Sequence, residues 1–370
     1  MATPVCAIAP GRVELLGNHT DYNRGLVLGA AIDRRVQFHA TPRDHNVATF
    51  RSAEFEEAAA ADLRKIAPLA NGSWANYALG VLRELQQLGF ELRGFDARIA
   101  SDLPLGSGLS SSAAFEVATA YAMVKLNSLA FEPLEIARLC RRAENRFVGV
   151  QSGLLDQATS VFGEAEHAVF IDCDTEEIRT IPFPGGCALV IADTRTAHRL
   201  SGGEFNARRD ETAAAARALH AGSLREVSVE QLEHARTSLA PTLHRRALHV
   251  VSENDRVLQA VAAMRVNDVR KIGQLMNASH ESSRSNFENS TAELDALAGF
   301  ARELPHVFGS RLTGGGFGGG TVTLAEAAHA SEIARELNAF WERRTGQSAN
   351  AFVCRISNGA AILNSDRRRE

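Results

Sequence analysis

The sequence has few cysteines, and they show no pattern typical of metal binding or disulfide formation. The five cysteines stand far apart, at positions 6, 140, 173, 187 and 354, and no Cys-x-x-Cys pair occurs. Such a set favours neither a disulfide framework nor a zinc site. The sequence also lacks an apolar run long enough to span a membrane, and no basic stretch followed by an apolar signal core begins it. We therefore expect no membrane partner and a cytoplasmic location.

An excess of positive charge is also missing. The 370 residues include 40 Lys and Arg against 44 Asp and Glu, for a net charge of −4. This balance provides no basic surface for nucleic acid, so no nucleic-acid partner is expected. The length favours two domains, and 45% apolar residues is ordinary for globular domains with full cores.

Several common phosphate-binding and catalytic motifs are absent. No Gly-Lys-Ser/Thr occurs, which excludes a Walker-type loop, and neither a protein-kinase motif set nor a Gly-x-Ser-x-Gly elbow is present. Gly314-x-Gly-x-x-Gly319 formally fits a dinucleotide fingerprint, but strand-like residues follow it where a helix is required. We interpret it as a flexible loop whose backbone can approach a ligand.

The stretch 103–114 holds the most informative motif of the sequence. Alternating apolar residues predict a strand before it, over 95–100, and helical spacing predicts a helix after it. Between them stand Gly106 and Gly108, which permit tight turns, and then Ser110, Ser111 and Ser112 at the expected helix start. Free amide groups at a helix start, aided by the helix dipole, bind phosphate. The alternative is an ordinary loop with glycine for turning and serine for capping.

A polar segment lies between two strand-like runs, 5–9 and 26–32. It holds Arg12, Asn18, His19 and Asp21. A carboxylate accepts two O–H bonds while His and Asn donate, so this set is suited to gripping the vicinal hydroxyls of a sugar. The alternative is a solvated hairpin turn, in which Asn, Asp and Gly are common.

Residues 74–88 predict an amphipathic helix, on which Trp74 and Tyr77 are either core residues or an adenine-stacking surface. A second helix is predicted from Pro133 to Phe147, with Glu144 near its C-terminal end, where the dipole opposes an acidic residue. Asp156 stands among apolar residues at the start of a further helical segment, where it either caps the helix or has a chemical role.

Residues 181–186 are the best linker candidate, followed by a buried strand over 187–192. The chain from 203 to 300 is largely helical in pattern, with helices predicted over 208–219, 229–239 and 247–264. The remaining predicted elements are a strand over 321–324, a helix over 325–342 and a last apolar run near 351–363.

These motifs resemble one known family. Residues 9–22 resemble the galactokinase signature, residues 105–113 the phosphate loop of the wider GHMP kinase family, and residues 313–319 its third motif. The order and separations also fit, and the similarity covers nearly the whole chain. The resemblance implies the α+β, two-domain GHMP kinase fold, with the active site between the domains. Residues 1–183 would form a ribosomal protein S5 domain 2-like domain, and residues 184–370 a ferredoxin-like domain.

The resemblance implies an ATP-dependent sugar 1-kinase that uses Mg²⁺, with a small sugar as substrate, and we expect a monomer. The magnesium ligands would be Ser111 and Glu144, since a hard cation takes oxygen ligands. The residues implied to hold ATP are Gly106, Ser107, Gly108, Leu109, Ser110, Ser111 and Ser112 in the loop, with Trp74, Gly315 and Gly316.

The resemblance assigns catalysis to Asp156, facing the anomeric hydroxyl, and to Arg12 beside it. A guanidinium favours the ionised carboxylate, which is a weak base. Because the transition state of phosphoryl transfer is loose, orientation and charge neutralisation should matter more than basicity. The implied sugar-binding residues are Asn18, His19, Asp21, Gly153 and Phe205.

Two positions depart from the family pattern. Asn18 stands where the signature has Glu, a position matched to the 6-hydroxyl end of the sugar, and Phe205 stands where the family usually has Tyr. Losing a hydrogen bond to a charged partner costs about 1.5–3 kcal/mol, so galactose is expected to bind more weakly than usual. Galactose is the default substrate by resemblance. The alternative is a sugar altered at carbon 6 or otherwise related, such as galacturonate, arabinose or N-acetylgalactosamine, because Asn18 would not repel an anionic carbon-6 group as Glu would. A non-catalytic sugar and ATP sensor is the alternative from another class.

Overall fold

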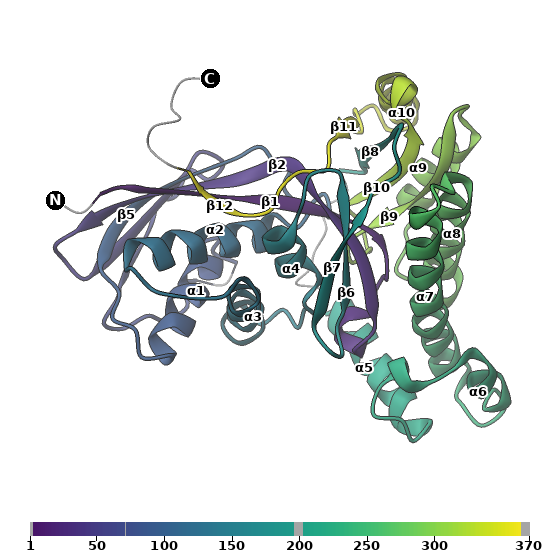
Figure 1. The fold of residues 1–370 in the computed structure, drawn as a ribbon, viewed down its shortest axis with the longest axis horizontal. Helices are drawn as coiled ribbons and strands as arrows, with labels where there is room; N and C mark the ends of the chain where they lie inside the picture. The colour runs from purple at the N-terminus through teal and green to yellow at the C-terminus, as the bar shows by residue number, and fades with distance from the viewer. Residues whose placement is uncertain (1–2, 71, 196–202, 364–370) are drawn as a thin grey trace.

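The computed structural model describes residues 3–70, 72–195 and 203–363, and it contains two β-sheets covered by helices (Figure 1). Strands and helices are mixed in both halves of the chain, and most neighbouring strands are antiparallel. This arrangement confirms the predicted α+β class.

The first sheet has eight strands within the described residues. Six follow the order β12-β1-β2-β5-β3-β4, while β6 pairs with β2 and β7 with β6. Its strands are β1 (Val5–Leu16), β2 (Leu26–Arg43), β3 (Val47–Ser52), β4 (Ala59–Asp62), β5 (Gly94–Ser101), β6 (His167–Asp172), β7 (Glu177–Pro182) and β12 (Ala361–Leu363). The first seven residues of β2 are all buried, as their continuous apolar run predicts.

Helix α2 is the central helix of this half. It packs on β1 and β2 and also contacts the three other helices. Apolar side chains surround α2 on nearly all sides, as expected for a helix buried among other elements. The four helices are α1 (Asn76–Gln87), α2 (Ser111–Leu126), α3 (Pro133–Ala143) and α4 (Leu155–Phe162).

The second sheet has the strand order β11-β8-β10-β9, with antiparallel neighbours. A strand, several helices, two strands, a helix and a last strand follow one another in the chain, which confirms the ferredoxin-like arrangement. The strands are β8 (Cys187–Asp193), β9 (Val307–Thr313), β10 (Gly320–Glu326) and β11 (Phe352–Cys354). The helices are α5 (Glu204–Ala218), α6 (Val229–His234), α7 (Pro241–Arg265), α8 (Val269–Ser282), α9 (Ala292–Glu303) and α10 (Ala330–Thr345).

The two halves are joined by more than one connection. Strand β12 pairs with β1, so residues 361–363 belong to the first sheet although they follow the predicted boundary at 183/184. One hydrophobic cluster also includes residues of both halves, among them Leu28, Leu189 and Met276. The division into 1–183 and 184–370 stays a proposal, and the structure adds that the end of the chain returns across it.

Some predicted boundaries were wrong. Arg12 lies within β1 rather than in the polar turn, and Leu88, expected on a buried helix face, follows α1 and is 50% exposed. The predicted linker begins too early, because Ile181 and Pro182 still belong to β7. Helix α6 ends at His234, before the predicted Leu239.

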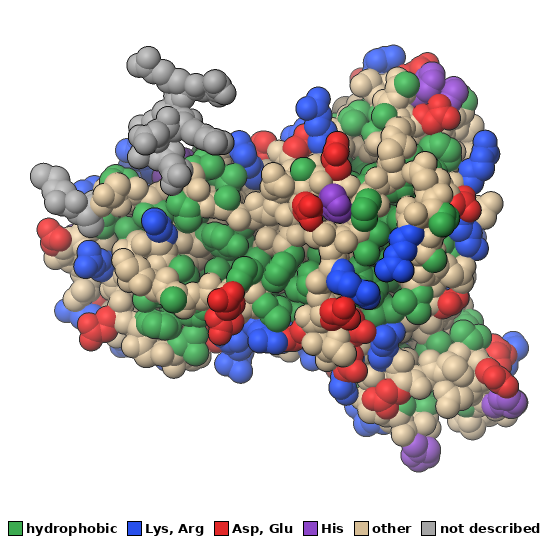
Figure 2. All heavy atoms as spheres, viewed as in Figure 1, with side chains coloured by type: hydrophobic (Ala, Val, Ile, Leu, Met, Phe, Trp, Pro, Cys, Tyr) green, Lys and Arg blue, Asp and Glu red, His purple; other side chains and the backbone are tan. Residues whose placement is uncertain are grey.

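On the face drawn in Figure 2, acidic and basic side chains lie interspersed over the C-terminal half. Among the described residues, no helix is both long and apolar enough to cross a bilayer.

Candidate active site

One cavity of about 270 Å³ brings together the three motifs that the sequence singled out. Its walls come from β1, the turn that follows it and the start of α4. Two loops complete them: the serine loop, residues 106–112 before α2, and the glycine loop, residues 314–319 between β9 and β10. The lining residues include nearly all of the predicted ones: Arg12, Asn18, His19, Asp21, Trp74, Gly106, Gly108, Leu109, Ser110, Ser111, Ser112, Glu144, Asp156, Phe205 and Gly315. Segments as far apart in the sequence as Arg12 and Gly315 therefore meet in one pocket.

Arg12 and Asp156 form an ion pair at the centre of this pocket. Arg12 Nε and Nη2 lie 2.8 and 2.7 Å from Asp156 Oδ1. Arg12 Nη1 donates to the carbonyl of Gly108 at 2.6 Å, and Ser110 Oγ donates to Asp156 Oδ2 at 2.6 Å. Arg12 is 5% exposed, whereas the Asp156 side chain keeps 25% of its surface open. The guanidinium thus fixes the carboxylate and the serine loop relative to each other.

The serine loop presents a row of free donors. The main-chain N–H groups of Gly108, Leu109, Ser110, Ser111 and Ser112 donate no hydrogen bond to any residue that the structure describes. Helix α2 begins at Ser111, so its positive dipole end faces the same place. Converging N–H groups at a helix start form a site for phosphate.

The expected serine cap was wrong. Ser110, the residue before α2, has φ 55° and makes no side-chain cap bond. Its hydroxyl points instead to Asp156, at 2.6 Å. A left-handed backbone is rare outside glycine, and such strain is common at functional sites. The serine loop is therefore shaped around the Asp156 carboxylate rather than around the helix end.

The glycine loop supports the serine loop by backbone contact. Gly108 has φ +77°, and a Cβ placed there would lie 2.6 Å from the Thr313 carbonyl oxygen. A Cβ on Gly314 would in turn lie 2.9 Å from the Gly108 carbonyl oxygen. The two motifs need glycine because their main chains touch.

Three predicted residues lie outside the cavity wall. Ser107 is 1% exposed and its hydroxyl donates to the Pro104 carbonyl. Gly316 lies against Asn289 and Gly153 against the Asp21 side chain. Of these contacts, that of Gly153 reaches a residue of the cavity wall, Asp21.

Glu144 lies in a π-helical turn, Glu144–Val148, that directly follows α3. Its Oε2 accepts hydrogen bonds from Ser152 Oγ and, at 3.0 Å, from Gln157 Nε2, while its Oε1 accepts none from the described residues. Burial raises its pKa to about 7, and the Ser152 and Gln157 bonds and Arg12 oppose that rise. A nearly buried carboxylate with one unpaired oxygen facing a cavity is suited to hold a cation, together with the Ser111 hydroxyl in the same wall.

The sugar-end residues of the signature are used differently from the expectation. Burial lowers the pKa of His19 to about 3, so the ring is neutral. Its Nε2 donates to the Gly315 carbonyl at 2.9 Å, and its Nδ1 accepts from Tyr22 at 2.7 Å. Both ring nitrogens are thus occupied within the protein.

Asp21 is a signature carboxylate that lines the pocket and keeps one oxygen unpaired. Its Oδ1 accepts from the Tyr22 main chain at 2.9 Å, and its Oδ2 accepts no hydrogen bond from the described residues. Burial, together with the charges of Asp156 and Glu14, raises its pKa to about 7. Asp21 is therefore an available acceptor for a ligand hydroxyl.

Phe205, on α5, lies beside two rings of the signature, His19 and Tyr22. Its ring centroid is 5.1 Å from that of His19 and 5.5 Å from that of Tyr22. It also approaches Gly315, which places that glycine beside the sugar-end residues.

A separate group of aromatic side chains also lines the pocket. Trp74 stacks on Phe55 with ring centroids 5.4 Å apart and planes 5° apart, and Phe115 lies 5.7 Å from Trp74. All three line the cavity. Trp74 was predicted from the sequence as a residue of this site, whereas Phe55 and Phe115 were not.

Residues of α7 that were not predicted from the sequence support the signature turn, residues 17–25 between β1 and β2. Glu253 Oε1 accepts from the main-chain N–H groups of Gly17 and Asn18 at 3.0 and 3.3 Å, and His249 Nε2 donates to the Asn18 carbonyl at 3.0 Å. Burial alone would raise the pKa of Glu253, but the Arg256 and Arg311 charges outweigh it and lower that pKa. These residues are more than 230 positions away, and no local pattern indicates the pairing.

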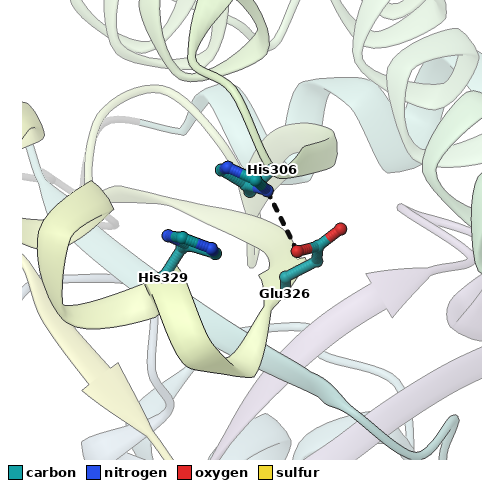
Figure 3. A group of neighbouring side chains, drawn as sticks. All are labelled: His306, Glu326 and His329. Carbon is teal, nitrogen blue, oxygen red and sulfur yellow. Dashed lines mark hydrogen bonds and ion pairs between the residues drawn. The ribbon is translucent and has the colours of Figure 1, made fainter.

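A second group of ligand-type side chains lies at the other end of β9 and β10. His306 Nδ1 and Glu326 Oε2 are 3.0 Å apart, and the rings of His306 and His329 stack with centroids 3.6 Å apart (Figure 3). An ion midway between the rings would lie about 1.8 Å out of each ring plane, although metal–nitrogen bonds are only about 2.0–2.1 Å long and lie in that plane. The arrangement is that of a hydrogen-bonded cluster rather than a metal centre.

Three family models match the chain. The galactokinase galactose-binding signature covers residues 2–42, the GHMP kinases N terminal domain covers residues 76–164, and the GHMP kinases C terminal model covers residues 260–343. The first two contain most of the pocket residues described above.

Individual proteins are similar over almost the whole length. A galactokinase of Roseiflexus sp. (strain RS-1) is 42% identical over 97% of this chain and 93% of its own, and one of Glaesserella parasuis serovar 5 (strain SH0165) is 37% identical over 98% and 96%. The crystal structure of Lactococcus lactis galactokinase complexed with galactose superposes with a TM-score of 0.93 at 32% identity, over 97% and 95% of the two chains. A mevalonate kinase with a TM-score of 0.67 and 19% identity shares the fold.

Proposed function

Because this chain belongs to the galactokinase family of GHMP kinases, we propose that it transfers the γ-phosphoryl group of ATP to the anomeric hydroxyl of galactose. The products are ADP and galactose 1-phosphate. The observation that carries the proposal is the Arg12–Asp156 pair beside five unpaired main-chain N–H groups in one pocket. Such a pocket supports both halves of the reaction, a positioned hydroxyl and a held phosphate.

In this function Asp156 orients the sugar hydroxyl and receives its proton as the oxygen–phosphorus bond forms. Arg12 fixes Asp156 through two contacts to Oδ1, so the carboxylate enters the reaction already oriented. The free N–H groups of the serine loop and the Arg12 charge stabilise the negative charge of the phosphoryl group.

ATP and Mg²⁺ fit the residues present. The unpaired Oε1 of Glu144 and the Ser111 hydroxyl would hold the ion, which when bound neutralises phosphate charge. The aromatic end around Trp74 and Phe55 offers flat faces for adenine.

A coupled ADP-release assay with a sugar panel tests the proposal. We expect the highest kcat/KM for galactose among galactose, galacturonate, arabinose and N-acetylgalactosamine. A preference for galacturonate would favour the altered carbon-6 alternative. No ADP release with any sugar, despite binding of sugar and ATP, would favour the sensor. The complete Arg12–Asp156 pair argues against the sensor.

We also propose that the enzyme acts as a monomer in the cytoplasm. Light scattering on the purified protein tests the first part, with the mass of 39.9 kDa expected for a single chain. Cell fractionation tests the second.

A further inference from the structure

Asn18, the residue expected to contact the remote end of the sugar, has no hydrogen-bonding capacity left. Its side chain is completely buried. Its Nδ2 donates to Glu14 Oε1 and to the Gly314 carbonyl, both at 2.9 Å. Its Oδ1 accepts from Asn289 Nδ2 at 2.8 Å and from Ser283 Oγ at 3.3 Å. An amide has two donors and two acceptor positions, so all four are used.

Glu14 differs from Asn18 in having one oxygen to spare. Its Oε1 accepts from Asn18 and, at 3.0 Å, from Arg311 Nη1, while its Oε2 accepts no hydrogen bond from the described residues. Glu14 also lines the cavity. Burial raises its pKa, and the charges of Arg311 and Arg12 oppose that rise. Arg311 is fully buried beside it and compensates the negative charge.

The strand places Glu14 relative to the reaction centre. In β1, Arg12 and Glu14 are two residues apart, so they lie on the same face, about 7 Å apart along the strand. Arg12 marks the place of the anomeric hydroxyl through Asp156. With the anomeric hydroxyl at Asp156, a sugar whose remote edge points along β1 brings its carbon-4 or carbon-6 hydroxyl to Glu14.

We propose that Glu14 determines sugar specificity by accepting a hydrogen bond from a hydroxyl on this remote edge, and that Asn18 and Arg311 position its carboxylate. The inference rests on the proposed sugar kinase function. It replaces the expectation that Asn18 opens the site to anionic sugars, because the Glu14 carboxylate next to it disfavours a uronate. Neutral sugars with a remote hydroxyl are the substrate class selected.

The test compares kcat/KM of wild type and Glu14→Gln for galactose, its 2-, 4- and 6-deoxy analogues and galacturonate. In wild type we expect loss of the 4- or 6-hydroxyl to reduce kcat/KM by about 10- to 100-fold, the range for a hydrogen bond to a charged group. In Glu14→Gln this penalty should shrink to a few-fold, and rejection of galacturonate should weaken. The 2-deoxy analogue, altered next to the anomeric carbon, serves as control, and its penalty should be the same in both proteins.

A uniform loss with all sugars in Glu14→Gln would overturn the inference, since it would indicate a structural role only. If this variant does not fold, wild type alone decides, because equal kcat/KM for galactose and both the 4- and 6-deoxy sugars contradicts the proposal. A wild type without activity on any sugar would contradict the proposed kinase function instead. The two failures are thus distinguishable.

Discussion

The two ends of the pocket differ in how their polar groups are used. At the phosphate end, the main-chain N–H groups of residues 108–112 have no partners among the described residues. At the sugar end, every hydrogen-bonding atom in the side chains of Asn18 and His19 has a partner within the protein. The first end holds its groups ready for a ligand. The second uses polar residues to attach the signature turn to the C-terminal half, through Gly314, Gly315 and Asn289. Polarity in a signature motif therefore does not identify a ligand contact, and only unpaired atoms do so.

The largest effect is expected at the reactive pair. Asp156→Asn keeps an oxygen for Arg12 but removes the negative charge to which we assign the orientation and deprotonation of the sugar hydroxyl. We expect kcat to fall about 10³-fold, equivalent to ~4 kcal/mol. Steady-state kinetics should show KM for ATP and sugar within a few-fold of wild type, and circular dichroism an unchanged fold. The same loss is expected for Arg12→Ala, and a kcat within tenfold of wild type in either variant would contradict the assigned roles.

The next largest effect is expected at Glu253, which holds the turn that carries Gly17 and Asn18. Glu253→Ala removes the acceptor of the Gly17 and Asn18 N–H groups and leaves Arg256 without its partner. We expect the free energy of unfolding to fall by about 3 kcal/mol, as for other broken buried ion pairs, and KM for sugar to rise more than KM for ATP. Asp255→Ala, on the exposed side of the same helix, is the matched control and should change neither. Equal increases in both KM values would mean that α7 does not act through the sugar end.

A smaller effect is expected where the two glycine motifs touch. Gly108→Ala forces a Cβ at φ +77° to within 2.6 Å of the Thr313 carbonyl oxygen. We expect a loss of about 2 kcal/mol in the free energy of unfolding and a raised KM for ATP. Gly106→Ala has a similar φ of +73° but meets nothing within 4 Å, so it separates backbone strain from the clash. Matching losses in the two variants would show that the contact between the motifs contributes nothing.

Part of the fold and of the candidate site was predictable from the sequence. Apolar runs predicted β8 and β10, and the three motifs, once recognised as a family pattern, predicted that Arg12, Asp156 and the serine loop share one pocket. These features depend on local periodicity or on conserved spacing. The left-handed backbone of Ser110 and the π-helical turn at Glu144 were not predicted, because the local pattern there equally fits a capped, regular helix.

The partners of the signature residues were beyond sequence reasoning for another reason. Asn18 and His19 have the composition of a sugar-binding turn, and composition does not tell whether a donor meets a ligand or a carbonyl group. Their partners come from positions 249–315, and only the folded chain brings these within hydrogen-bond distance. Glu14 was overlooked although it stands in the predicted polar segment, because nothing in the local pattern distinguishes its carboxylate from an exposed one.

The smallest expected effect is a change in the pH dependence of stability caused by Asp21, whose carboxylate keeps one oxygen unpaired. The folded protein holds the Asp21 proton more tightly than the unfolded chain, since the pKa rises from 3.8 to about 7. Ionisation of Asp21 therefore lowers stability as the pH rises from about 4 to about 7, and the full penalty remains above that range. Asp21→Asn abolishes this penalty. Because Asp21 keeps some contact with the pocket, we expect the ligand-free variant to be more stable than wild type at pH 8 by on the order of 1 kcal/mol, and equal at pH 4.

Urea denaturation at several pH values, without sugar or Mg²⁺, measures this difference. Asp96→Asn is the control of opposite sign, because hydrogen bonds from Thr49 and Arg43 lower the pKa of Asp96, so its replacement should reduce stability at pH 8. A stability difference between Asp21→Asn and wild type that does not change with pH would mean that Asp21 is no more costly to ionise than a surface carboxylate. In that case the Asp21 carboxylate would be well solvated in the folded protein, and Glu14 Oε2 would be the buried unpaired acceptor that remains at the sugar end.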